Sequence, residues 1–144
     1  MKKISILLAF LLVGCSASSK QITYDNYIGQ ASNIPSSTTN YMYDITANLE
    51  LFANDEYIYQ VIIDNPKELM ENIQIVAVHN QTTDDVFPSI GIFDGNYSLL
   101  VDGKTKGINL VGYIKEGSYE TVTIKVMVKY NNITNYHIFK LDKN

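Results

Sequence analysis

The ten residues TVTIKVMVKY, at positions 121–130, carry the clearest structural pattern in this chain. Apolar side chains alternate here with threonine and lysine, and a period of two is typical of a strand with one buried face. We expect the buried face to hold Val122, Ile124, Val126, Val128 and Tyr130, and the opposite face Thr121, Thr123, Lys125 and Lys129. Asn131-Asn132 then predicts a turn, followed by a last strand from Tyr136 to Leu141.

The same alternation recurs upstream. It predicts a strand over 41–51, a turn at 53–56 and a hairpin partner over 57–63 that ends at Asn65-Pro66, because proline has no N–H for the ladder. Residues 73–78 are apolar on both faces, which predicts a central strand. Further short strands are expected over 89–93, 97–101 and 108–114, with at most one helical turn over 68–72.

Seven or eight short strands joined by turns predict an all-β domain over residues 41–144. The expected architecture is two packed antiparallel sheets, an immunoglobulin-like sandwich. A closed barrel is the alternative. This range contains neither cysteine nor tryptophan, so its core must be built from Ile, Val, Leu and Tyr.

Composition excludes several classes of protein. The 144 residues are 46% hydrophobic and 18% charged, as in globular proteins. All 11 basic residues are lysine and the net charge is −4, which argues against a nucleic-acid partner. The single cysteine excludes a disulfide scaffold. No apolar run reaches about 20 residues, so a bundle of transmembrane helices is not expected.

The N-terminus has the pattern of a signal peptide over residues 1–14. Lys2 and Lys3 precede an apolar run, residues 4–13, that is too short to span a bilayer. The run ends in Leu12-Val13-Gly14-Cys15, which resembles a bacterial lipobox. The resemblance implies that the Cys15 sulfur receives a diacylglyceryl group and that the chain is cut just before it. An ordinary secretory signal cleaved around Cys15-Ser16-Ala17 is the alternative.

The absence of arginine, with 14 Asn and 18 Ile, suggests an AT-rich genome. Together with the lipobox, the chain resembles small lipoproteins of low-GC Gram-positive bacteria. This implies a protein anchored in the cell membrane through Cys15, facing the extracytoplasmic side. Residues 15–40 are rich in Ser, Thr, Asn and Gln and predict a flexible tether, unless Ile22, Tyr24, Tyr27 and Ile28 dock on the domain as an edge strand.

The segment Val61-Ile62-Ile63-Asp64-Asn65-Pro66 resembles part of small immunoglobulin-like modules of the FxLYD and water-stress types. That resemblance implies an interaction module rather than a reaction.

The sequence predicts neither a cofactor nor a metal. His79 and His137 have no ligand-type residues at suitable spacing, and no nucleophile elbow or phosphate loop is present. A calcium site is one interpretation of the acidic residues of 84–102; turn formation is the other, since Asp94-Gly95-Asn96 and Asp102-Gly103 are turn sequences.

The long irregular stretch 80–96 is the expected binding region, because binding residues concentrate on loops of rigid scaffolds. Its candidate residues are Thr82, Thr83, Asp84, Asp85 and Phe87. We therefore expect a non-catalytic module that binds a protein or an envelope component; a lipoprotein that binds a small ligand or metal ion is the alternative.

Overall fold

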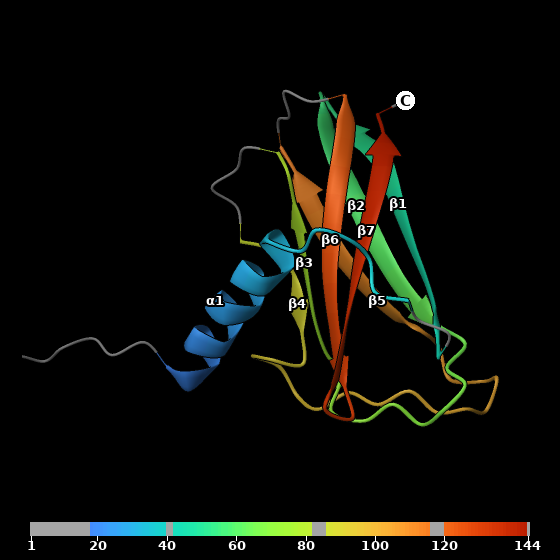
Figure 1. Cartoon of the computed structure of the whole chain (residues 1–144). Coiled ribbons are helices and arrows are strands. Elements are labelled where there is room, and N and C mark those ends of the chain that lie inside the picture. The colour runs from blue at the N-terminus through green and yellow to red at the C-terminus, as the bar shows by residue number, and fades with distance from the viewer. Residues whose placement is uncertain (1–17, 40–41, 82–85, 116–119, 144) are drawn as a thin grey trace, which may run out of the picture.

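A computed structural model describes residues 18–39, 42–81, 86–115 and 120–143. One helix, α1 (Ser19–Ser32), precedes seven strands (Figure 1). The strands are β1 (Asp44–Ala53), β2 (Glu56–Asp64), β3 (Gln74–His79), β4 (Ser89–Ile90), β5 (Ile108–Ile114), β6 (Thr121–Tyr130) and β7 (Ile133–Asp142). The predicted all-β class is confirmed.

The strands form two separate sheets, so the fold is a sandwich and not a closed barrel. One sheet has the order β1-β2-β5 and the other β4-β3-β6-β7, and every pair is antiparallel. In a constant-type immunoglobulin domain the fourth strand belongs to the sheet of the first two. Here β4 pairs with β3 instead, which gives an immunoglobulin-like sandwich of three and four strands.

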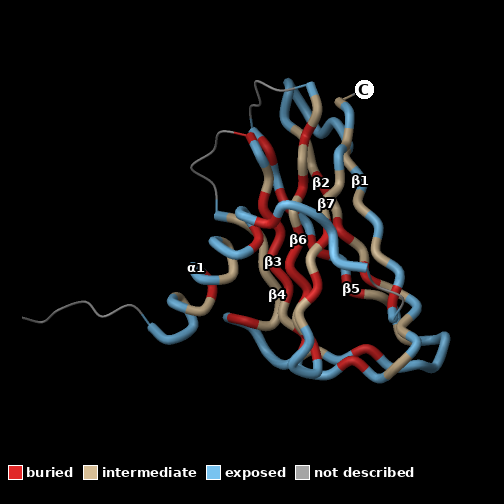
Figure 2. Tube along the Cα trace, viewed as in Figure 1, coloured by how far each residue is buried: buried red, intermediate tan, exposed pale blue. Residues whose placement is uncertain are grey.

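The main core lies between the sheets, where Figure 2 shows the buried segments of β2, β3 and β6. The predicted register of β6 is confirmed, because its expected inward residues are all buried: Val122, Ile124, Val126, Val128 and Tyr130. Tyr59, Val61 and Ile63 of β2 face them from the other sheet. Two hairpin turns, Asn54-Asp55 and Asn131-Asn132, have positive φ at both residues, as two-residue loops of this kind require.

A second core lies outside the four-stranded sheet, under α1. The side chain of Ser18 caps the helix by accepting a hydrogen bond from the Gln21 N–H (3.2 Å). Tyr24, Ile28 and Ala31 follow at helical spacing, so they share one face. That face packs on the outward residues of β3 and β6: Val76, Val78 and Met127.

The prediction of a flexible tether, or of an edge strand at Ile22, Tyr24, Tyr27 and Ile28, is therefore wrong for residues 19–32. The apolar face of α1 packs on the apolar outer face of the four-stranded sheet, and this packing stabilises a helix whose sequence is otherwise polar. The same contact explains why β3 is apolar on both sides, as expected for its central place. Neither α1 nor any other described segment is a helix of the length and apolarity needed to cross a bilayer.

Residues 33–39, which we call the strap, run from α1 across the outer face of β6 to the outer edge of β7 (Figure 1). The Thr38 N–H donates to the Tyr136 carbonyl (2.7 Å), and the Thr38 hydroxyl accepts from the Tyr136 N–H (3.1 Å). The Ser37 hydroxyl accepts from the Ile138 N–H (2.9 Å). The strap thus satisfies backbone groups that an edge strand would otherwise leave open.

Three local expectations differ from the structure. The strand expected over 97–101 is reduced to one bridge between Met70 and Leu99, because this pairing extends over too few residues to form a ladder. The strand expected over 89–93 is only Ser89–Ile90, since Gly91 turns the chain with φ +77°. Residues 68–72 do not form a helical turn.

Candidate functional site

Residues 86–88 separate two surface grooves. The α1 groove, of about 360 Å³, is lined by Gln21, Tyr24, Asp25, Ile28, Val86, Phe87 and Phe93. The β5 groove, of about 270 Å³, is lined by Val86, Pro88, Val111, Gly112, Tyr113 and Lys115. Both grooves therefore border the region 80–96 in which the sequence predicts binding.

Phe87 is the one predicted binding residue that the structure places. Its ring contacts that of His79 (centroids 5.1 Å apart), and the His79 ring contacts that of Tyr59 (5.8 Å). Its carbonyl accepts a hydrogen bond from the Tyr24 hydroxyl (2.8 Å). Phe87 thus ties the loop to the core and to α1. The other predicted residues, Thr82, Thr83, Asp84 and Asp85, lie outside the described residues, as does Cys15.

The α1 groove is mostly apolar. The rings of Tyr24 and Phe93 form one side, with centroids 5.4 Å apart. Burial raises the pKa of Tyr24, so its hydroxyl stays protonated and donates to Phe87. Sequence reasoning missed this groove because it missed the helix; the spacing of Tyr24, Ile28 and Ala31 was the available signal.

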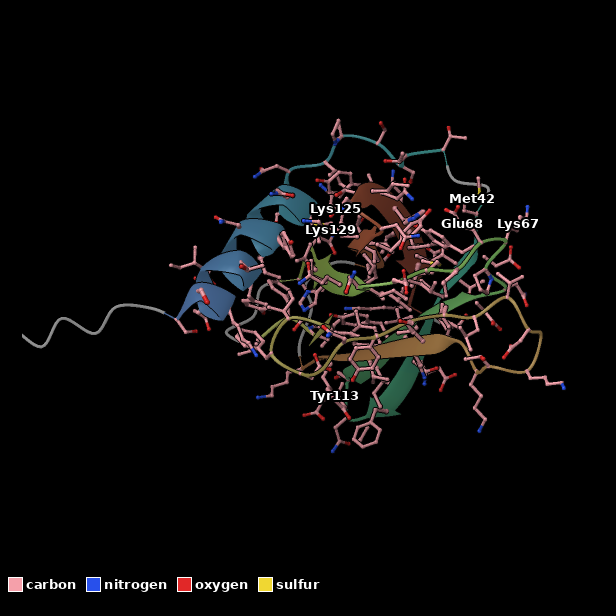
Figure 3. All side chains as sticks on the ribbon, turned by 90° about the horizontal axis from the view of Figure 1, so that it is seen from below. Met42, Lys67, Glu68, Tyr113, Lys125 and Lys129 are labelled. Carbon is pink, nitrogen blue, oxygen red and sulfur yellow. The ribbon has the colours of Figure 1, made fainter. Side chains whose placement is uncertain are left out.

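The β5 groove continues onto the outer face of the three-stranded sheet. Tyr113 is 57% exposed there and projects away from the sandwich (Figure 3). Ile58 lies opposite Tyr113 on β2, and Val111 lies two residues along β5. The described ranges contain one helix, α1, and it covers the other sheet, so this apolar strip remains open to solvent.

Lys125 and Lys129 point toward α1 rather than into open solvent (Figure 3). The Lys125 ammonium donates to the carbonyls of Ser32 (2.9 Å) and Ile34 (3.3 Å), where the helix ends. The Lys129 ammonium donates to the Tyr27 hydroxyl (3.1 Å). The alternation placed both lysines on the correct face, but the helix over that face gives them a structural role.

Both histidines have hydrogen-bond partners within the protein. His79 accepts a hydrogen bond at Nδ1 from the Gln81 N–H (3.1 Å) within the aromatic contacts of Phe87. His137 is buried beside Tyr43, and burial lowers its pKa to about 4. A neutral, buried imidazole with a phenol partner needs no metal to satisfy it.

Asp94 and Asp102 form turns, as the second interpretation above expects, whereas Asp84 and Asp85 lie outside the described residues. Asp94 accepts hydrogen bonds from the Gly91 N–H and the Tyr97 hydroxyl, both at 2.7 Å. Burial opposes ionisation of Asp94, but these hydrogen bonds outweigh it and lower its pKa. Asp102 accepts from Thr105 and from the Lys104 N–H, which lowers its pKa as well. Among the described residues, no group of three or more His, Cys, Asp or Glu side chains is arranged to hold a metal.

Comparison of the chain with protein family models, with curated proteins and with solved structures found no match. A function must therefore be argued from the chain's own residues.

Proposed function

We propose that the chain is a membrane-anchored lipoprotein on the extracytoplasmic side, whose sandwich domain is a non-catalytic module that binds a protein or an envelope component. The anchor is argued from the N-terminal sequence, where the only cysteine of the chain ends the only signal-like segment. Two acyl chains on Cys15 would hold the protein stably, which a single chain does not.

The observation that carries the binding role is the open apolar strip of the β5 groove. Tyr113 is 57% exposed, next to Val111 at 37%. Exposed tyrosine beside aliphatic residues is typical of protein-binding surfaces, because the ring gives contact area and its hydroxyl tolerates water. Lys115 at the groove's edge adds a cation beside these apolar side chains.

The overall charge supports a partner other than an anionic polymer. Removing Lys2 and Lys3 with the signal peptide leaves nine lysines against 15 acidic residues, a net charge of −6. Such a domain is repelled by anionic lipids and wall polymers. We therefore favour a protein partner that meets the apolar strip.

Photo-crosslinking in intact cells tests this function. A photo-reactive residue at Tyr113 of the full chain should give one discrete adduct, whereas the same residue at Lys140, exposed on β7, should give none. Replacing Thr82, Thr83, Asp84 and Asp85 with glycine and serine should remove the adduct if the loop contributes to binding. The same adducts at both positions, or none at Tyr113, would contradict the proposed surface.

A further inference from the structure

The helix α1 starts very close to the proposed anchor. Ser18 is already the N-cap, so three peptide units separate its Cα from that of Cys15. Covalent geometry limits this span to about 11 Å. The helix itself is about 21 Å long, since its 14 residues each rise about 1.5 Å. A link this short keeps the N-terminal end of α1 within about 11 Å of the anchored residue.

Exposed apolar side chains surround this same end of the molecule. Ile22 in the first turns of α1 is 52% exposed, and Phe93 and Val86 beside the α1 groove are 47% and 83% exposed. The Tyr24 ring joins the helix to Phe93. Figure 1 shows this end of α1 projecting from the side of the sandwich, away from β1 and β7.

The charges at this end permit contact with lipid. Lys20 and Asp25 are the charged residues of α1 and cancel each other. Asp94, next to Phe93, keeps its negative charge, because hydrogen bonds from the Gly91 N–H and the Tyr97 hydroxyl lower its pKa. The charges described at this end therefore sum to −1, so we expect contact with a zwitterionic lipid surface rather than with an anionic one, which repels the acidic domain.

We propose that the α1 groove and the apolar side chains around it rest on the outer surface of the bilayer in which Cys15 is anchored. This inference rests on the proposed lipid anchor. The domain then lies against the membrane and is not raised above it on a flexible tether. Because α1 covers the four-stranded sheet, the three-stranded sheet and Tyr113 then face away from the lipid.

Nitroxide quenching of site-specific fluorophores tests the orientation. Lipidation consumes the Cys15 thiol, so the full-length variants Ile22→Cys, Phe93→Cys and Tyr113→Cys would each offer one reactive thiol. The labelled proteins are reconstituted in phosphatidylcholine vesicles with and without headgroup-nitroxide lipid. Labels at 22 and 93 should be blue-shifted and quenched by the nitroxide, whereas the label at 113 should keep its intensity.

Two results would overturn the orientation alone. Either the vesicles carry the protein but all three labels behave alike, or labels at 22 and 93 are blue-shifted without quenching, which means that a second copy or another protein covers them. If wild-type protein reacts with the dye at Cys15 and stays free of vesicles, the proposed anchor is wrong, and so is the orientation that depends on it.

Insertion of about 20 Gly and Ser residues between Ser16 and Ala17 should weaken quenching at positions 22 and 93. Undiminished quenching would show that the short link is not what holds these two positions at the membrane.

Discussion

The Oη atom of Tyr43 lies 2.7 Å from Nε2 of His137, in a buried contact between the residue just before β1 and the middle of β7. The two side chains are only 4% and 6% exposed. Burial raises the pKa of Tyr43 and lowers that of His137 to about 4, so both groups are neutral at neutral pH.

This pair predicts acid sensitivity. Below pH 6.5 the unfolded chain protonates His137 but the folded chain does not until about pH 4. The free energy of unfolding should therefore fall as the pH falls through this window, by at most about 1.4 kcal/mol per pH unit. Urea denaturation at several pH values, on wild type and on His137→Gln, measures the difference.

Tyr43→Phe is the control for that experiment. It removes the hydrogen bond but keeps the imidazole buried, so it should lower stability at every pH and leave the pH dependence in place. A His137→Gln variant with the full wild-type slope would show that another group causes the acid sensitivity.

Removing the Lys125 ammonium should weaken the docking of α1 on the sheet. Lys125→Met leaves the carbonyls of Ser32 and Ile34 without their cationic donor at the negative end of the helix dipole. We expect a loss of about 1–2 kcal/mol and faster hydrogen exchange in α1. Lys140→Met, on the exposed side of β7, should change neither. Equal exchange in the two variants would contradict the structural role of Lys125.

Gly91 should not tolerate a side chain. Its φ is +77°, and a Cβ there would collide with the carbonyl oxygen of Ile73. Gly91→Ala should therefore displace β4 from β3 and lower the melting temperature by several degrees. Gly95→Ala is the matched control, because a Cβ at Gly95 meets no atom within 4 Å. Similar melting temperatures for the two variants would mean that the turn at Gly91 is looser than described.

Cys15→Ser should abolish membrane attachment. The serine hydroxyl is a far weaker nucleophile than a thiolate and cannot take the lipid as a thioether. Wild type should enter the detergent phase of a phase separation, and the variant should stay in the aqueous phase or persist as an uncleaved precursor. Wild-type protein in the aqueous phase, with an N-terminus beyond Cys15, would refute lipidation.

The strands could be predicted because alternation reports directly on burial. Tyr59, Val61 and Ile63 on β2, like the inward residues of β6, follow a period of two that only a half-buried strand explains. The helix was hidden because only Tyr24, Ile28 and Ala31 mark its face within a sequence of weak helix formers. A second signal lies in β3 and β6, where the apolar outward residues Val76, Val78 and Met127 indicate that another element packs on this face of the sheet.

Of the candidate site, only its region could be predicted. The long loop drew attention to residues 80–96, and both grooves border it. Their other walls come from α1 and β5, which lie far from the loop in sequence. Local patterns do not reveal such pairings, because a groove is a property of packed surfaces and not of a single segment.

The strap makes the two ends of the chain depend on each other. Thr38 and Tyr136 are 98 residues apart, yet their backbones pair, and α1 docks on β3 and β6, which are made much later. The N-terminal layer therefore has nothing to dock on until most of the polypeptide has left the ribosome, and such non-local closure is slow. For the export proposed above, this late docking is favourable, because α1 and the strap stay undocked while the chain passes through a secretion channel.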